Sequence, residues 1–272
     1  MTRLMGIVNV TPDSFSDGGR YLDADRAIEH ARALVAEGAD LLDVGGESTR
    51  PGARAVSADE ELRRVLPVLE GLDGLGVPIS IDTSKAAVAE VALHAGAELV
   101  NDVTALRADP ELAAVCAARG CDVVLMHMQG SPRTMQEAPA YGDVVEEVKG
   151  FLAERIRVAT RSGVAEDRIW VDPGIGFGKT VEHNLELLRR LSELRDLGRP
   201  VVVGTSRKSF IGTLTGREVG DRLGGAIASN VLAVRAGADV LRVHDVAQVR
   251  EAVRIAEAIL ERGPAGSGRS ST

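Results

Sequence analysis

The stretch Glu37-Gly38-Ala39-Asp40-Leu41-Leu42-Asp43-Val44 decides the fold, because its opening recurs twice later in the chain. The other copies begin Ala95-Gly96-Ala97-Glu98 and Ala236-Gly237-Ala238-Asp239. A polar or charged residue lies five positions after each glycine: Asp43, Asn101 and Arg242. A glycine just past a helix takes the left-handed conformation at low cost, so each copy predicts a helix end, a turn and a strand. Side chains alternate along a strand, so the shared offset points these residues to the same side of the sheet.

Short Val/Ile/Leu-rich runs without a polar face predict strands covered on both sides, at residues 5–10, 41–44, 79–82, 99–103, 123–127, 169–172, 201–204 and 240–244. Apolar spacings of three and four predict helices between them, at residues 23–36, 58–72, 84–94, 110–118, 143–162, 180–194, 222–235 and 247–261. This alternation predicts an α/β fold, a single-domain (β/α)8 TIM barrel over residues 1–262, with a disordered tail at residues 263–272. A doubly wound open sheet is the structural alternative.

Composition excludes several classes of partner. The chain has 272 residues and a net charge of −8, with acidic and basic residues mixed, so we expect no nucleic-acid partner and no cationic membrane surface. No apolar stretch approaches the roughly 20 residues that span a bilayer, and Met1–Leu4 carries no signal-peptide core, which predicts a cytoplasmic protein. Cys116 and Cys121 have no nearby His or Cys partner, so we interpret them as core thiols rather than metal ligands.

Function is predicted at the C-terminal ends of the strands. The first two strand-to-helix connections, residues 11–22 and 45–57, are long, and barrel enzymes keep their active sites on such loops. Nearly all the predicted strands also end on a polar or ionisable residue: Asn9, Asp43, Asp82, Asn101, His127, Asp172, Ser206, and Arg242 with His244.

Distinctive motifs occupy these strand ends: Asn9-Val10-Thr11-Pro12-Asp13-Ser14-Phe15, Gly45-Gly46-Glu47-Ser48-Thr49-Arg50-Pro51-Gly52, Asp172-Pro173-Gly174-Ile175-Gly176-Phe177-Gly178-Lys179 and Ser206-Arg207-Lys208-Ser209. With them the chain resembles the bacterial dihydropteroate synthases from Met5 to about Glu261. The resemblance implies a transferase of folate biosynthesis, in which p-aminobenzoate displaces pyrophosphate from 6-hydroxymethyl-7,8-dihydropterin pyrophosphate to give 7,8-dihydropteroate. Sulfonamides compete with p-aminobenzoate in this family. A pterin-dependent methyltransferase domain and a non-catalytic pterin-binding paralogue are the functional alternatives.

A pterin edge needs both donors and acceptors, which Asp82, Asn101, Asp172 and Lys208 supply from four strand ends. Taken singly, Asp82 could merely cap the next helix and Lys208 could be a solvated charge. The resemblance implies that Asp172 binds the aminopyrimidine edge and Lys208 the carbonyl side. It assigns Asp82 and Asn101 to the remaining ring nitrogens.

Pyrophosphate needs cations, and Arg50, Arg207, Arg242 and His244 lie at strand ends. The resemblance implies a Mg²⁺ cofactor with Asn9 as its protein ligand. It also implies a pyrophosphate site formed by Asn9, Thr49, Arg50, Arg242 and His244. His244 and His127 could each instead be structural histidines.

An apolar slot for p-aminobenzoate is implied by the resemblance at Phe15, Thr49, Pro51, Phe177 and Ser209. The alternative for the two phenylalanines is packing against neighbouring loops.

Catalysis is predicted to be electrostatic, because the sequence contains no evident nucleophile arrangement and an aromatic amine needs no strong base. We expect pyrophosphate to leave first, with Asp82, Lys208, Arg242 and His244 as the catalytic residues. The family also implies a homodimer formed through the last helices. Its members usually carry a longer segment before the first strand, so we expect the barrel floor to be less covered here.

Overall fold

The structure is a computed structural model that describes residues 1–11, 20–49, 52–53 and 55–261. The described residues form the strands β1 (Arg3–Asn9), β2 (Leu41–Gly45), β3 (Ile79–Asp82), β4 (Leu99–Asp102), β5 (Asp122–Met126), β6 (Ile169–Asp172), β7 (Val202–Val203) and β8 (Val240–Val243). They also form the helices α1 (Arg20–Ala36), α2 (Ala58–Gly71), α3 (Ala86–His94), α4 (Leu112–Arg119), α5 (Val144–Arg161), α6 (Val181–Arg189), α7 (Ser209–Thr215), α8 (Leu223–Arg235) and α9 (Val246–Glu261). Short 3-10 helices are η2 (Glu166–Arg168), η3 (Leu191–Leu197) and η4 (Val219–Asp221).

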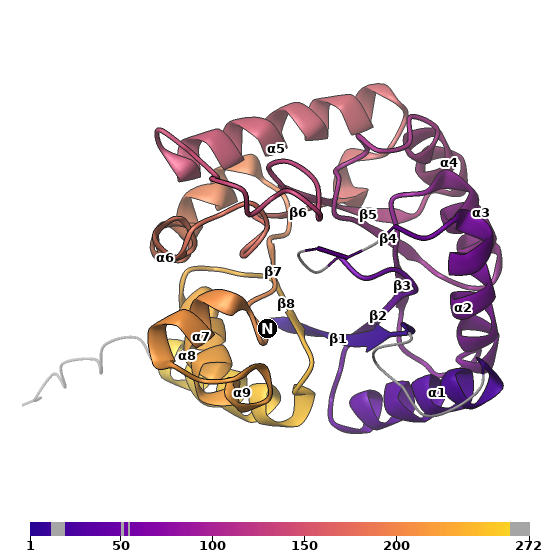
Figure 1. The fold of residues 1–272 in the computed structure, drawn as a ribbon, viewed down its shortest axis with the longest axis horizontal. Coiled ribbons are helices and arrows are strands. Elements are labelled where there is room, and N and C mark those ends of the chain that lie inside the picture. Colours follow the sequence, from indigo (N-terminus) through magenta and orange to yellow (C-terminus); the bar gives the residue numbers. More distant parts are fainter. Residues whose placement is uncertain (12–19, 50–51, 54, 262–272) are drawn as a thin grey trace, which may run out of the picture.

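All the strands belong to one parallel sheet with the order β6-β5-β4-β3-β2-β1-β8-β7. A parallel bridge between Val171 and Val201 joins β6 to the approach to β7 and brings the two ends of the sheet together. The helices form an outer ring around the strands (Figure 1). The predicted TIM barrel is therefore confirmed, and the open-sheet alternative is excluded.

The glycines of the three repeated segments have the predicted left-handed conformation. Gly38, Gly96 and Gly237 follow α1, α3 and α8 with φ of +103°, +100° and +93°. After α1, the Gly38 N–H donates to Val35 O and the Ala39 N–H to Leu34 O, which closes the helix end and turns the chain into β2.

Alternation along the strands divides the barrel interior into layers. The lower layer is an apolar cluster of side chains that are at most 5% exposed: Met5, Leu41, Leu99, Val124, Trp170, Val202 and Val240. Two positions later on the same strands lies a mostly polar layer: Ile7, Asp43, Asn101, Met126, Asp172, Gly204 and Arg242. Because residues two positions apart on a strand face the same side, the polar side chains lie directly above the buried apolar layer.

A side chain from β1 covers part of the barrel floor. The Arg3 guanidinium lies over the Trp170 ring, with its carbon 4.3 Å from the ring centroid, and Trp170 is only 5% exposed. A cation on an aromatic face shields the ring from water while the charge stays hydrated.

Side-chain caps fix the start of several outer helices. Ser57 accepts from the Glu60 N–H at α2, Asp143 accepts from two N–H groups at α5, and Thr180 forms a capping box with His183 at α6. Two helix predictions were incomplete: α7 was not predicted, and the helix expected at 180–194 ends at Arg189 and continues as η3. None of the described helices is both long enough and apolar enough to cross a membrane.

Candidate active site

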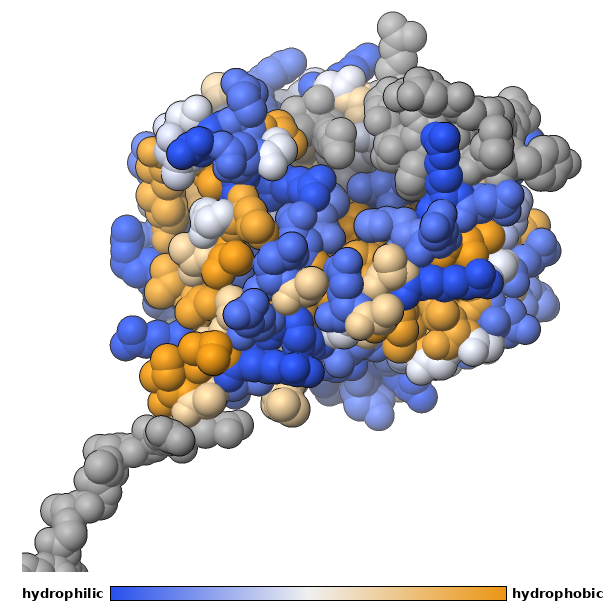
Figure 2. Space-filling model, turned by 90° about the horizontal axis from the view of Figure 1, so that it is seen from below, coloured by the Kyte–Doolittle hydropathy of each residue, from blue (hydrophilic) through white to orange (hydrophobic). Residues whose placement is uncertain are grey.

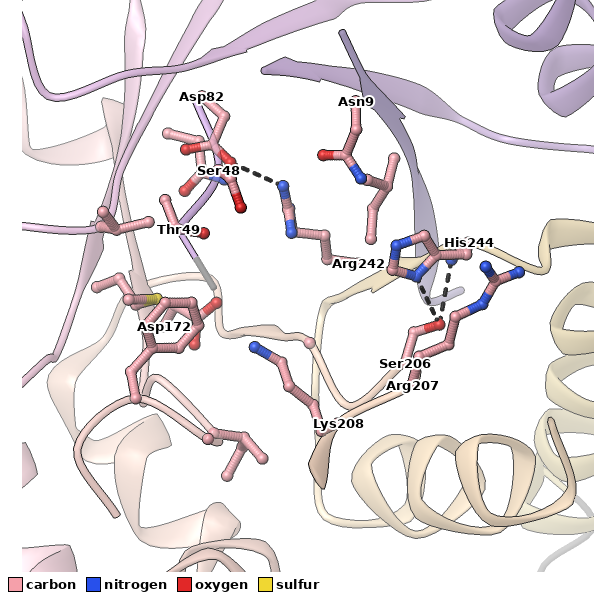
Figure 3. Close-up of a pocket in the computed structure, with 18 of the residues that line it drawn as sticks. Asn9, Ser48, Thr49, Asp82, Asp172, Ser206, Arg207, Lys208, Arg242 and His244 are labelled. Atoms are coloured by element: carbon pink, nitrogen blue, oxygen red, sulfur yellow. Dashed lines mark hydrogen bonds and ion pairs between the residues drawn. The ribbon is translucent and has the colours of Figure 1, made fainter. Parts of the chain in front are cut away.

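A cavity of about 450 Å³ opens at the C-terminal ends of the strands. The predicted site residues that line it are Asn9, Thr49, Asp82, Asn101, Asp172, Phe177, Lys208, Ser209, Arg242 and His244. Figure 3 shows several of these side chains converging from different strands. The predicted residues Phe15, Arg50 and Pro51 lie outside the described part of the chain. Groups distant in sequence therefore meet around one space, as the strand-end pattern predicts.

Arg242 lies at the centre of the polar layer. Its Nε donates to Asp43 Oδ2 at 2.6 Å and its Nη2 to Asp82 Oδ2 at 2.8 Å (Figure 3 shows the Asp82 contact). Asn101 Nδ2 donates to the same Asp43 oxygen at 3.0 Å. Asp43 is fully buried, and its Oδ1 has no hydrogen-bond partner among the described residues. Since a buried carboxylate needs a cation, Arg242 holds β8 to β2 and β3 electrostatically.

Burial also shifts the proton affinity of Asp82. It raises the pKa of this carboxyl above its usual range, while the Arg242 guanidinium opposes the shift and the Asp43 carboxylate adds to it. Two carboxylates thus share one guanidinium. A ligand that brings positive charge to Asp82 would relieve their mutual repulsion.

Asp172 and Lys208 face each other across the other side of the cavity (Figure 3). The Gly174 N–H donates to Asp172 Oδ1 at 2.6 Å, and no hydrogen bond joins Oδ2 to another described residue. Burial raises the pKa of Asp172, against this N–H and against Lys208. Burial and Arg242 lower the pKa of Lys208 to about 8, against the carboxylates of Asp172 and Asp82. One acceptor and one donor are therefore available to a ligand.

Phe177 forms an apolar wall next to this pair. Its ring packs in a cluster with Val103, Met126, Met128 and Met135, and Lys208 Nζ lies 4.0 Å from its ring centroid. Sequence reasoning did not anticipate the two wall methionines of the cavity, Met126 and Met135, because isolated methionines carry no specific signal.

The loop after β7 is held by a residue that sequence reasoning also missed. Arg222 donates to the carbonyl oxygens of Arg207 at 3.1 Å and Lys208 at 3.3 Å. Arg207 has a φ of +58°, a backbone conformation that is costly for residues other than glycine. Its guanidinium pairs with the Asp245 carboxylate at 2.8 Å. Arg222 thus helps to fix the backbone that presents Lys208 and Ser209.

His244, Ser206 and Asn9 lie together on the β1 and β8 side of the cavity (Figure 3). The backbone N–H of His244 donates to Ser206 Oγ at 3.3 Å, and the ring Nδ1 of His244 lies 3.0 Å from the same hydroxyl oxygen. The Asn9 side chain makes no hydrogen bond to another described residue. No group of three or more His, Cys, Asp or Glu side chains suited to a metal occurs in the described part of the chain.

The start of the second loop is anchored by charge. Lys85 Nζ bonds both Glu47 and the fully buried Glu61, and Arg64 Nη1 donates to Gly46 O at 2.8 Å. These contacts hold the backbone that leads to Thr49.

Asp43 and His127 support the site from outside the cavity lining. Asp43 lies in the same layer as Asn101 and Arg242, as the shared offset predicts, and it accepts hydrogen bonds from both, a role that was not predicted. His127 lies outside the cavity and contacts Lys179 instead, which favours the structural alternative for this histidine.

Comparisons with known proteins agree with one another. A family profile described as "Pterin binding enzyme" matches residues 5–244. The chain is 46% identical to the dihydropteroate synthase of Synechocystis sp. over 95% of this chain and 90% of the relative, and 47% identical to that of Escherichia coli over 94% and 91%. A crystal structure of the Clostridium difficile dihydropteroate synthase with pteroic acid matches with a TM-score of 0.90 at 50% identity, covering 95% of this chain and 96% of that one. The Xanthomonas albilineans enzyme with 4-aminobenzoic acid matches with a TM-score of 0.91 at 50% identity, covering 97% and 94%.

Proposed function

We propose how this chain, which belongs to the dihydropteroate synthases of the pterin-binding enzyme family, carries out their transferase reaction of folate biosynthesis with its own residues. The proposed substrates are 6-hydroxymethyl-7,8-dihydropterin pyrophosphate and p-aminobenzoate, and the products are 7,8-dihydropteroate and pyrophosphate. One observation carries the proposal: the pterin-edge residues expected from four strand ends, Asp82, Asn101, Asp172 and Lys208, line a single cavity.

The pterin ring would lie between Asp172 and Asp82. The unbonded Asp172 Oδ2 suits the N–H groups of the aminopyrimidine edge, and Lys208 suits the ring carbonyl. Each pairing matters because an unpaired buried donor or acceptor costs about 1–3 kcal/mol.

The p-aminobenzoate and the pyrophosphate group would then lie above the pterin ring. Phe177 and Ser209 border the space assigned to p-aminobenzoate, next to the wall methionines. His244, Thr49 and Arg242 border the space assigned to pyrophosphate. The structure of the X. albilineans enzyme with 4-aminobenzoic acid supports p-aminobenzoate as a substrate by analogy.

We propose a dissociative order of steps. The C–O bond to pyrophosphate breaks first, and its electron pair leaves with the pyrophosphate, which His244 and Arg242 retain. The positive charge on the pterin methylene group spreads into the ring beside Asp82, whose carboxylate stabilises it. The nitrogen lone pair of the neutral p-aminobenzoate amine then forms the C–N bond with the methylene carbon, and the amine proton passes to the retained pyrophosphate. The apolar wall at Phe177 excludes water that would otherwise capture the cation.

Asn9 suits the Mg²⁺ that the family implies. Its carboxamide makes no hydrogen bond to another described residue, and Mg²⁺ is commonly held by one protein oxygen together with water and substrate phosphate oxygens. Bound Mg²⁺ would neutralise charge on the pyrophosphate.

Removing Mg²⁺ with a chelator should lower turnover by about a hundredfold or more, because several kcal/mol of charge stabilisation is lost. Adding Mg²⁺ back should restore the rate. Binding of 6-hydroxymethylpterin, which lacks the pyrophosphate, should be unchanged when measured by calorimetry. Full activity in the chelated enzyme would contradict the Mg²⁺ assignment.

The experiment that tests the function is a pyrophosphate-release assay with the pterin substrate, run with and without p-aminobenzoate. We expect release coupled to the formation of 7,8-dihydropteroate, with a sulfonamide acting as a competitor of p-aminobenzoate. Pterin binding without any release would favour a non-catalytic paralogue. Methyl transfer to a corrinoid without condensation would favour the methyltransferase alternative.

We also propose that the enzyme is a homodimer formed through α8 and α9. Large apolar side chains are exposed there, with Leu232 at 57%, Ile255 at 61% and Ile259 at 67%. Figure 2 shows hydrophobic surface near the end of α9. Replacing Ile255 and Ile259 with glutamate should give a monomer in analytical ultracentrifugation. A monomeric wild-type protein at micromolar concentration would contradict the proposal.

A further inference from the structure

Lys179 is a buried lysine that the mechanism above does not use. Its side chain is 3% exposed, and Nζ lies 2.9 Å from His127 Nδ1, 3.0 Å from Phe177 O and 3.5 Å from His127 O. An ammonium group has three N–H donors, so these three acceptors satisfy it completely. No ion pair links it to a carboxylate among the described residues.

The protonation states agree with this geometry. Burial, with the nearby Lys179 charge, lowers the pKa of His127 to about 2, so its imidazole is neutral. The Lys179 amine beside Nδ1 then assigns the ring proton to Nε2, which leaves Nδ1 as the acceptor. Burial also lowers the pKa of Lys179 to about 7. Keeping this amine out of water is costly, which argues that its contacts serve a purpose beyond packing.

Lys179 connects two loops whose backbones touch. A Cβ added at Gly174 would lie 1.9 Å from His127 O, and one at Gly178 would lie 2.6 Å from Gln129 O. The loop after β6 therefore lies directly on the loop after β5. The Lys179 side chain closes this contact by bonding His127 from one loop and the Phe177 carbonyl from the other.

Phe177 is the member of this arrangement that reaches the cavity. Its carbonyl is held by Lys179, while its ring forms the apolar wall next to Lys208. Neither Lys179 nor His127 lines the cavity. The contact of the pair with the apolar wall of the cavity therefore passes through Phe177.

We propose that Lys179 and His127 form a clamp that positions Phe177 and so sets the affinity for the arylamine substrate more than the affinity for the pterin. The clamp rests on the proposed function, because it requires that Phe177 borders the p-aminobenzoate space. Without the clamp, the Phe177 carbonyl would lose the hydrogen bond from Lys179, and the Phe177 ring would no longer be held at a fixed distance from the p-aminobenzoate space.

The test compares Lys179→Met, which keeps the length and loses the donors, with Lys149→Met as a matched control. Lys149 lies on α5 and pairs with Asp196 on the outside of the barrel. For Lys179→Met we expect the KM for p-aminobenzoate and the inhibition constant of a sulfonamide to rise about tenfold or more. The KM for the pterin substrate and the kcat should stay within about threefold. The control should match wild type in all four constants.

Folding is checked by thermal unfolding and by 6-hydroxymethylpterin binding. If Lys179→Met does not fold, Lys179→Gln carries the test, because its amide retains N–H donors and should raise the KM for p-aminobenzoate by a smaller factor. An unchanged KM for p-aminobenzoate in a folded variant would overturn the clamp. An equal rise in both KM values would also overturn it, since that pattern indicates general loosening. Failure of the wild-type enzyme to consume p-aminobenzoate would instead contradict the proposed function.

Discussion

Replacing Arg242 with methionine is expected to lower kcat/KM by about a thousandfold, measured as pyrophosphate release at low substrate concentrations. Arg242 is the guanidinium that contacts Asp82 at 2.8 Å, and it borders the space assigned to pyrophosphate. Methionine fills a similar volume but supplies neither a charge nor donors. The variant should therefore fail to stabilise the leaving group and should leave Asp82 unanchored.

The same substitution should lower the free energy of unfolding by about 3 kcal/mol, because it leaves the buried Asp43 without its cation. Adding Asp43→Asn should recover part of this stability, as the second change removes the uncompensated charge. It should not recover activity, which separates the structural contribution of Arg242 from the catalytic one. Arg217→Met is the matched control, since Arg217 pairs with Asp221 on the surface and is 64% exposed. A kcat/KM for Arg242→Met within about threefold of wild type would show that the catalytic assignment is wrong.

The fold and much of the site are predictable from the sequence for one reason: parallel strands have a period of two. Asn101, Asp172 and Arg242 each stand two positions after a buried apolar residue on the same strand, and that spacing alone directs them into the barrel mouth. The glycine after each helix marks where the next strand begins, so the register of the repeating unit is visible locally.

Contacts between distant loops are less accessible to such reasoning. Lys179 and His127 are 52 positions apart, and each looks locally like an ordinary strand-end or loop residue. Their pairing depends on how closely two loops approach, which is set by Gly174 and Gly178 against a neighbouring backbone. No single-segment pattern encodes that distance.

The missed helix α7 has a different cause. The segment Ser209–Thr215 contains two threonines, an isoleucine and a glycine, all weak helix formers, and it is only seven residues long. Tertiary contacts stabilise it instead, since Phe210 and Ile211 are buried. The position of Asp43, in contrast, is predicted by the alternation that also places Arg242, but the contact between their side chains is not.

Asp172→Asn should raise the dissociation constant for 6-hydroxymethylpterin by about a hundredfold, measured by calorimetry. The reason lies in the Gly174 N–H, which already occupies Asp172 Oδ1 at 2.6 Å. An asparagine would keep its single carbonyl oxygen on this donor and turn its NH₂ group toward the cavity. That group would then meet the N–H donors of the aminopyrimidine edge, so two buried donors would face each other instead of a donor and an acceptor.

The change is nearly isosteric, so loss of binding should come with little loss of stability, and the KM for p-aminobenzoate should stay within about threefold. Asp122→Asn is the matched control, because Asp122 begins β5 at the opposite end of the barrel and pairs with Arg168. If the introduced amide instead flipped to present its oxygen to the pterin, its NH₂ would face the Gly174 N–H. The same mismatch would then arise on the protein side, so binding should weaken in either orientation. Unaltered pterin affinity in the folded variant would therefore remove Asp172 from the pterin site.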